Sequence, residues 1–158
     1  MLSKKTKYAI NALVYLARQN KTSGSKPVQI IKIAESEHIP RKFLEAILLD
    51  LKNAGILNSK KGKAGGYFLQ KSPDEINIAE VMRLFDGAIA LLPCVAHLYY
   101  AKCEECADEA TCGIRDVFAE VRAESVRMLK KATLTEIVNR AEALALKVNA
   151  QNNNTATA

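Results

Sequence analysis

Hydrophobic residues recur every three or four positions in three stretches of the first half of the chain, which predicts three helices. The first covers about Lys4–Asn20 and ends in a loop rich in Gly, Ser and Pro. The second is short, about Val28–Glu37. The third begins with Pro40 as its first residue and stops at Gly55, which suits a left-handed cap. The side chains expected in the core are Ala9, Leu13, Leu16, Ala17, Ile30, Ile31, Ile33, Ala34, Phe43, Leu44, Ile47, Leu48 and Leu51.

Two short runs of strand-forming residues follow the third helix, about Ile56–Lys60 and Tyr67–Leu69. A turn rich in Gly and Lys separates them, so they predict a β-hairpin. Helix, helix, tight turn, helix and hairpin is the order of a winged helix-turn-helix. The predicted fold is therefore mainly α with a small β-hairpin: a winged helix-turn-helix domain plus a long dimerisation helix.

The second half predicts three further helices. Asn77 and Glu80 resemble a capping pair, and after Gly113 a long helix carries apolar residues at every third or fourth position. Thr133 begins a last helix that reaches about Lys147. The apolar stripe of the long helix is a candidate dimer interface, formed by Ile114, Val117, Phe118, Val121 and Met128.

These elements divide the chain into five parts. They are a DNA-binding winged helix at 1–72, a connecting helix at 73–86, a cysteine-rich sensor loop at 87–112, the dimerisation and C-terminal helices at 113–147, and a polar tail at 148–158 expected to be disordered.

Charge separates the two halves. Residues 1–71 hold 14 basic and 4 acidic side chains (14 − 4 = +10), and residues 72–158 hold 9 and 13 (9 − 13 = −4). A strongly basic block suggests that the first half meets a polyanion such as DNA. The third helix would present Arg41 to guanine and Glu45 to cytosine in the major groove. The full set of candidate DNA contacts is Lys4, Lys5, Arg41, Lys42, Glu45, Lys60, Lys61 and Lys63.

The composition narrows the class of protein. No run approaches the roughly 20 apolar residues that span a bilayer, so no membrane contact is expected. The basic N-terminus lacks a small-residue cleavage site, and a cytoplasmic location with reduced thiols is expected. The chain has no nucleotide-binding fingerprint and only two histidines, which argues against an enzyme.

All four cysteines lie within nineteen residues, spaced C-x8-C-x2-C-x5-C. Thiols gathered this closely indicate one shared function, either a metal centre or disulfide exchange. Three chemistries fit: an iron–sulfur cluster, a closed four-thiolate zinc site, or a metal-free switch between Cys103 and Cys106. The candidate metal ligands are Cys94, Cys103, Cys106 and Cys112. His97 is a further possible ligand, although a solvated or packed histidine is the simpler interpretation.

Several runs together resemble the Rrf-two family of bacterial winged-helix regulators, which includes the IscR, NsrR and CymR types. They are KYAINALVYLA, RKFLEAILLDLKNAGIL, SKKGKAGGYFL, VMRLFDG, CGIRDVFAEVR and TLTEIV, so the resemblance covers about residues 1–140. It implies a homodimer that binds palindromic double-stranded promoter DNA, typically a repressor, with dimer contacts on the long helix after the cysteine loop.

The resemblance also bears on the cysteines. IscR and NsrR types hold an iron–sulfur cluster through C-x5-C-x5-C, and Cys106 and Cys112 match only the second half of that spacing. Tyr100 stands at the first position, and Arg115 stands where IscR types place a histidine. Lys7 and Tyr8 occupy the region where NsrR types use an aspartate. A fourth cysteine is present, so an all-cysteine cluster is the simplest proposal.

The expected function is that of a dimeric transcriptional regulator whose cysteine loop senses redox state, iron or a reactive small molecule. CymR types respond without a cluster, which keeps zinc and a metal-free switch open as alternatives. A cluster-bearing electron carrier is a further alternative, but it would leave the basic first half without a purpose.

Overall fold

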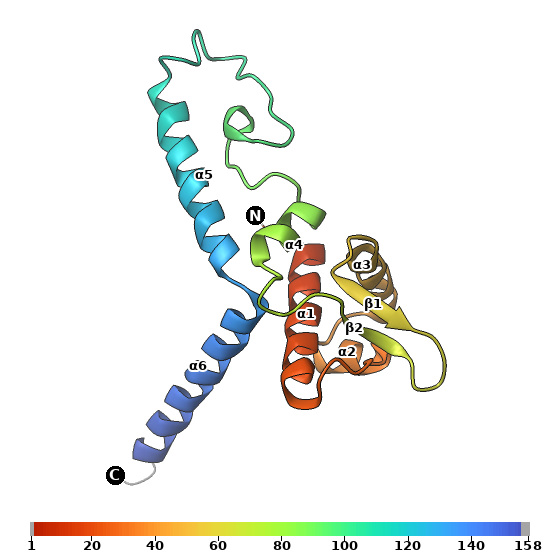
Figure 1. Ribbon diagram of the computed structural model, residues 1–158. Helices are drawn as coiled ribbons and strands as arrows, with labels where there is room; N and C mark the ends of the chain where they lie inside the picture. The colour runs from red at the N-terminus through yellow and green to blue at the C-terminus, as the bar shows by residue number, and fades with distance from the viewer. Residues whose placement is uncertain (1, 156–158) are drawn as a thin grey trace.

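The computed structural model describes the backbone of residues 2–155 and the side chains of residues 2–151. It is mainly helical with one two-stranded antiparallel hairpin, which confirms the predicted fold class. Figure 1 shows the elements in chain order: α1 (Lys4–Ser23), α2 (Ile30–Ser36), α3 (Arg41–Asn53), β1 (Leu57–Lys60), β2 (Gly66–Leu69), α4 (Ile78–Phe85), the short 3-10 helix η1 (Pro93–Val95), α5 (Gly113–Lys131) and α6 (Leu134–Thr155).

Helix α1 is the centre of the fold, because α3, α4 and α6 all pack against it. Ser3 caps it: the Ser3 Oγ accepts a hydrogen bond from the Thr6 backbone N–H at 3.1 Å. Its predicted inward face is confirmed, and the buried residues recur at helical spacing as Ala9, Leu13, Leu16 and Ala17. Burying that apolar stripe, rather than helix propensity alone, stabilises the helix.

The recognition helix of the helix-turn-helix, α3, buries Leu44, Ile47, Leu48 and Leu51 completely, as predicted. The prediction for Phe43 is wrong, because its side chain is 54% exposed. At about 100° per residue, Phe43 lies roughly a quarter turn from the centre of the buried stripe. Its ring instead meets the edge of Tyr8 on α1, with ring centroids 6.3 Å apart.

Two smaller predictions for this region also need correction. Ile31 is 44% exposed, because it lies on the opposite side of α2 from the buried Ile33. Pro40 is the N-cap of α3 rather than its first residue, and the helix begins at Arg41. The predicted left-handed cap at Gly55 is confirmed by its φ of 70°.

The hairpin is tied to the loop before α2 as well as to itself. Leu57 pairs with Leu69 in the β1–β2 register, and Val28 bridges to Tyr67 through two backbone hydrogen bonds of 2.8 Å. The backbone at Gly66 has φ +152°, and a Cβ there would collide with the Val28 carbonyl. Only glycine therefore allows the hairpin to approach the helix-turn-helix this closely.

A backbone joint fastens the two long helices to the rest of the molecule. Ile78 N–H donates to the Ala132 carbonyl and Leu134 N–H donates to the Ile76 carbonyl, both at 3.0 Å. Ile76 and Leu134 are fully buried beside this joint. The predicted caps are confirmed next to it, since Asn77 accepts from the Glu80 N–H at 3.1 Å and Thr133 accepts from the Glu136 N–H at 3.2 Å.

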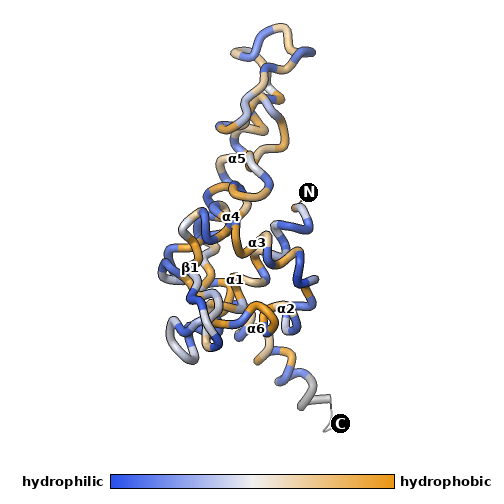
Figure 2. The backbone as a smooth tube through the Cα atoms, turned by 90° about the vertical axis from the view of Figure 1, so that its right-hand side faces the viewer, coloured by the Kyte–Doolittle hydropathy of each residue, from blue (hydrophilic) through white to orange (hydrophobic). Residues whose placement is uncertain are grey.

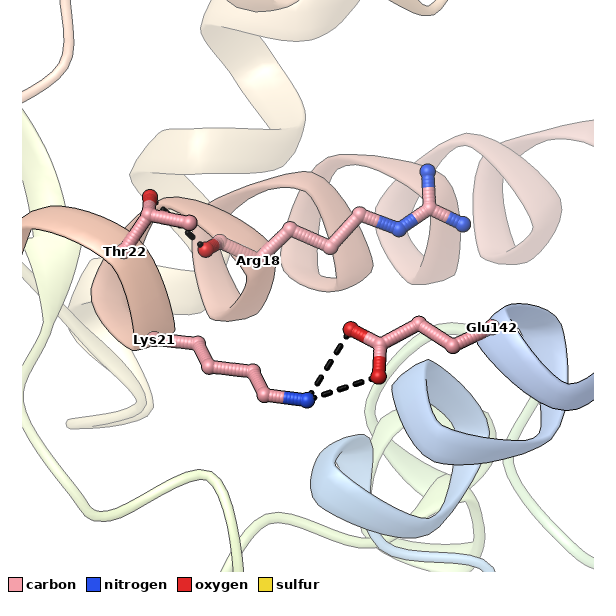
Figure 3. Close-up of polar contacts among 4 residues, drawn as sticks. All are labelled: Arg18, Lys21, Thr22 and Glu142. Atoms are coloured by element: carbon pink, nitrogen blue, oxygen red, sulfur yellow. Dashed lines mark hydrogen bonds and ion pairs between the residues drawn. The ribbon is translucent and has the colours of Figure 1, made fainter.

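Helices α5 and α6 leave this joint in different directions, so the cysteine segment at the top of α5 stands away from the winged helix (Figure 1). Helix α6 crosses α1, where Lys21 Nζ lies 2.7 Å from a Glu142 carboxylate oxygen (Figure 3). The Thr22 hydroxyl meanwhile donates to the Arg18 carbonyl within α1.

The C-terminal prediction is wrong in part. Helix α6 continues to Thr155, although the polar run from residue 148 was expected to be disordered. The run contains neither Gly nor Pro, so nothing in it stops a helix that is already propagating. Residues 156–158 of the predicted tail lie outside the described residues.

No helix between residues 2 and 155 is long and apolar enough to span a bilayer. Figure 2 shows the hydrophobic backbone positions gathered around α1, with mixed colours along α5 and the cysteine segment.

The substitution Gly66→Ala should destabilise the protein by more than about 1 kcal/mol, because the new Cβ meets the Val28 carbonyl and the φ is unfavourable for alanine. Urea denaturation followed by circular dichroism measures this. Gly113→Ala is the matched control: nothing lies within 4 Å of its Cβ position, and the residue begins α5. An unchanged midpoint for Gly66→Ala would show that the contact between the hairpin and the helix-turn-helix is not tight.

Candidate functional site

The first turn of α3 and the hairpin turn face the same space. Arg41 and the glycines of the turn, Gly62 and Gly66, line one surface cleft together with Tyr67 of β2. Arg41, Lys42 and Glu45 are exposed, as predicted, and so are Lys60, Lys61 and Lys63 of the hairpin. Six of the eight candidate DNA contacts are thus exposed on the first turns of α3 and on the hairpin, and the surface formed by these two elements is here called the DNA face.

Arg41 and Glu45 are already paired with each other on that face. The Arg41 Nε lies 3.1 Å from a Glu45 carboxylate oxygen, and both side chains are more than half exposed. An exposed pair of this kind contributes about 0–1 kcal/mol. Either side chain can therefore turn to a base edge at little cost in free energy.

The structure adds basic and polar residues that the sequence reasoning missed. Lys26 and Lys32 line a second cavity beside the hairpin turn, which is also lined by Gln29 and Gly65. Gln29 supports the turn directly, since its side-chain amide donates to the Lys63 carbonyl at 3.1 Å. Only their positive charge signalled the two lysines in the sequence, and the Val28–Tyr67 bridge that places them here is a tertiary contact.

Lys4 and Lys5 lie elsewhere. Lys5 Nζ pairs with Asp50 at 2.7 Å, near the last turn of α3, and also lies 5.2 Å from the centre of the Phe85 ring. Lys5 thus links α1, α3 and α4 internally rather than standing free on the DNA face. Lys4 is exposed at the same end of α1.

Helix α5 has no buried residue in the chain as described. Four of the five predicted interface residues are exposed apolar side chains: Ile114 at 66%, Val117 at 57%, Val121 at 41% and Met128 at 64%. Phe118 is half-buried. A row of exposed apolar residues on one helix is a surface that favours burial against a partner.

The four cysteines fall into two groups. Cys94 is buried in η1 at 6% exposure, whereas Cys103, Cys106 and Cys112 are partly exposed. Cys112 is the N-cap of α5, and its sulfur accepts from the Arg115 backbone N–H at 3.5 Å. All four are free thiols.

Cys106 and Cys112 form an asymmetric pair. The Arg115 backbone N–H donates to the Cys112 sulfur, and this bond, followed by the nearby Cys106 side chain, lowers the pKa of Cys112. The Cys106 thiol donates to the Asp108 carbonyl at 3.4 Å. Proximity to Cys112 is the main cause of the raised pKa of Cys106, and the charge of Cys103 adds to it. The first turn of a helix also favours negative charge on a cap. Cys112 is therefore the thiol that ionises more readily.

Two side chains hold the cysteine segment in shape. The Arg115 guanidinium Nε donates to the Cys94 carbonyl at 3.4 Å, which connects α5 to η1. The Tyr100 hydroxyl donates to the Glu109 carboxylate, with O–O distances of 2.6 and 2.8 Å. The tyrosine at the position of the missing cysteine therefore closes the loop through a hydrogen bond.

The four thiols are the ligand type that iron–sulfur and zinc centres use, and they lie in one segment of the chain. Cys106 and Cys112 lie close enough to shift each other's pKa, and Cys103 is close enough for its charge to raise the pKa of Cys106. Within residues 2–155, however, no three His, Cys, Asp or Glu side chains are already gathered as a metal site. His97 is exposed beyond Cys94 and makes no hydrogen bond among the described residues.

Comparison with known proteins identifies the family. The family model Rrf2, described as an iron-dependent transcriptional regulator, matches residues 2–140. The chain belongs to the Rrf2 family of transcriptional regulators. This is the Rrf-two family of the sequence resemblance, which is thereby confirmed.

Relatives of this Rrf2 regulator agree with that assignment. An rrf2-like HTH-type transcriptional regulator from Rhodobacter capsulatus is 41% identical over 138 residues, covering 87% of this chain and 92% of the relative. The protein is thus a DNA-binding transcriptional regulator and not an enzyme.

Solved structures show the same fold. CymR, described as the global cysteine regulator of B. subtilis, has a TM-score of 0.72 at 24% identity, covering 89% of this chain and 97% of that one. T. potens IscR has a TM-score of 0.69 at 23% identity, covering 91% and 90%. At these identities the likeness confirms the winged-helix architecture alone.

In the metal-free, reduced Rrf2 regulator, Cys112 should react with iodoacetamide faster than Cys106 near neutral pH. A lowered pKa means that the reactive thiolate of Cys112 is already present at lower pH, while that of Cys106 forms only at higher pH. Tandem mass spectrometry of the tryptic peptide 103–115 after brief labelling measures both sites. Replacing Cys112 with serine should accelerate labelling of Cys106, and equal rates in the unaltered protein would contradict the asymmetry.

Proposed function

We propose that this Rrf2 regulator binds duplex promoter DNA with α3 in the major groove and the hairpin turn against the backbone. The observation that carries this proposal is the shared DNA face, where Arg41 and the hairpin glycines line one cleft. Lys60, Lys61 and Lys63 are exposed there without an ion pair in the described structure. Unpaired lysines on a glycine-rich turn suit phosphate or minor-groove contact.

Base contacts would come from the first turns of α3. Arg41 donates to guanine and Glu45 accepts from the cytosine amino group, each leaving the weak pair it makes in the free protein. Lys42 stands beside them and suits a phosphate. Lys4, exposed at the start of α1, would contact phosphates outside the DNA face, while Lys5 contributes mainly through its contact with Asp50.

A second copy of the chain is the proposed partner of α5. The apolar row from Ile114 to Met128 is exposed in the single chain, and pairing two such rows removes both from water. A two-fold dimer would present two α3 helices to two half-sites. The proposed division of labour follows: residues 1–72 bind DNA, 73–86 connect, 87–112 sense, and 113–147 dimerise.

The cysteine segment is the proposed sensor of redox state, iron or a reactive small molecule. Cys103, Cys106 and Cys112, with Cys94 as the fourth ligand, would hold an iron–sulfur cluster. Bound there, such a cluster supplies a centre whose charge and integrity depend on iron and oxidants. The segment begins where α4 ends and stops where α5 begins, so fixing its thiols fixes α4 relative to α5. If one state of the cysteine segment favours one arrangement of the two protomers, the spacing of the two α3 helices changes, and the affinity for DNA changes with it.

Two alternatives for the cysteines have support of their own. The closeness of Cys106 and Cys112, each of which shifts the pKa of the other, favours a metal-free thiol switch, because a thiolate near a second thiol suits disulfide exchange with an oxidised partner. The four thiols also suit a closed zinc site. An electron carrier has no comparable support, since it would not use the DNA face.

Removing two hairpin lysines should flatten the salt dependence of DNA binding. For the double variant Lys61→Ala and Lys63→Ala on a mixed-sequence duplex, the slope of log K against log[salt] should become less negative by about 0.9 for each lost phosphate contact, which is about 2 for each protomer and about 4 for the proposed dimer. Fluorescence anisotropy at several salt concentrations gives both slopes.

The matched control for this prediction is the double variant Lys131→Ala and Lys147→Ala. It changes the net charge by the same amount but alters α5 and α6, away from the DNA face. Its slope should equal that of the unaltered protein. Equal flattening in both variants would mean that total charge, and not the hairpin, determines binding.

Anaerobically purified protein should contain iron and acid-labile sulfide in stoichiometric amounts and absorb visible light. Serine at position 103, 106 or 112 should remove the absorption, and Cys94→Ser tests the buried fourth ligand. His97→Asn is the control and should retain the absorption. Stoichiometric zinc without sulfide, or no metal at all, would contradict the cluster and favour one of the two alternatives.

A further inference from the structure

A second candidate site is lined by α4, α5 and residues 88–98, in the region between the winged helix and the four cysteines. It is an open cavity of about 540 Å³, within the range of small-molecule sites. Three positively charged side chains and one histidine line it: Arg83 from α4, Arg122 and Lys130 from α5, and His97 from the cysteine segment. We call it the basic cavity.

The basic cavity is positively charged, whereas residues 72–158 as a whole carry a net negative charge. Residues 72–158 hold 13 acidic and 9 basic side chains, yet no acidic side chain lines the cavity. Arg122 and Lys130 are eight positions apart on α5, which places them on one face with Val126 between them. Eight positions correspond to about 12 Å along the helix axis, a span that a ligand with two separated acidic groups can bridge.

Two arginines of the cavity are without a partner among the described residues, whereas two others on α5 and α6 are each paired with a glutamate. Arg127 on α5 pairs with Glu124 at 2.6 Å, and Arg140 on α6 pairs with Glu136 at 2.8 Å. Arg83 and Arg122 make no ion pair or hydrogen bond to any described residue. Their guanidinium groups keep all their donors available, in the fork geometry that suits carboxylate and phosphate.

The remaining lining is apolar, so the cavity has a mixed character. Ile89, Leu98 and Val126 form its walls, together with two alanines. A bare inorganic ion would leave those walls in contact with water, whereas a molecule with a short carbon frame covers them.

We propose that the basic cavity binds a small organic polyanion, with at least two carboxylate or phosphate groups on a short carbon frame. Its acidic groups bind Arg83, Arg122 and Lys130, and its carbon frame lies against Val126 and Leu98. The ligand would connect α4, α5 and the residue three positions after Cys94. Binding does not rest on the proposed DNA function, so it is measured without DNA.

Isothermal titration of the full chain tests the proposal with two probes, citrate for carboxylates and 2,3-bisphosphoglycerate for phosphates. Acetate at equal ionic strength is the monovalent reference. At least one of the two polyanions should bind, and Arg122→Gln should weaken it about tenfold or more, the effect expected for one charge-assisted hydrogen bond. Lys130→Gln, at an exposed position that folding tolerates, should weaken the same ligand.

Arg127→Gln is the matched control, because it removes the same charge from the same helix outside the cavity. Its affinity should match that of the unaltered protein. The proposal fails if neither polyanion binds better than acetate, or if Arg127→Gln weakens binding as much as Arg122→Gln. It also fails if the monomer binds the polyanion and the dimer does not, because carboxylates of a second copy would then occupy the cavity.

Discussion

The joint between residues 76–78 and 132–134 is the constraint on which the arrangement of this protein depends. Two backbone hydrogen bonds of 3.0 Å and the buried pair Ile76 and Leu134 hold the end of α5, the start of α6 and the start of α4 together. Everything beyond it, including α5 and the cysteine segment, is positioned relative to the winged helix from this point. Sliding or separating the two segments would leave these buried backbone N–H and C=O groups without hydrogen-bond partners, which is unfavourable. A change in the cysteine segment therefore reaches the winged helix through α4 and α5 together.

The elements with a regular hydrophobic period could be predicted from the sequence. Leu44, Leu48 and Leu51 recur along one face of α3, and burial of that face is what the period measures. Phe43 and Ile31 are apolar but exposed, because Phe43 lies about a quarter turn from the buried stripe of α3 and Ile31 lies opposite the buried Ile33 of α2. The end of α6 was missed for a different reason: polar composition indicated disorder where no helix-breaking residue was present.

The parts of the candidate sites that could not be predicted are contacts between distant segments. Nothing local in the sequence links Val28 to Tyr67, yet that bridge places Lys26 and Lys32 beside the hairpin turn. Lys5 looks like any N-terminal lysine until Asp50, 45 positions away, is found against it. In the same way, the net charge of residues 72–158 is negative. That total does not reveal the basic cavity, which forms only because α4 and α5 lie side by side.

The cysteine segment differs physically from the rest of the chain, and the difference suits a sensor. Between η1 and α5 no helix or strand is formed among residues 96–112, so few backbone hydrogen bonds oppose a rearrangement there. Cys112 is the exception, since as the cap of α5 it is fixed to a long helix, and Cys94 is held by burial in η1. Cys103 and Cys106 lie on the irregular part between these two fixed points. A centre that held Cys94 and Cys112 together with Cys103 or Cys106 would therefore tie η1 to the first turn of α5. Arg115 already bridges that gap through the Cys94 carbonyl, so the connection between the two fixed points exists before any metal or disulfide forms.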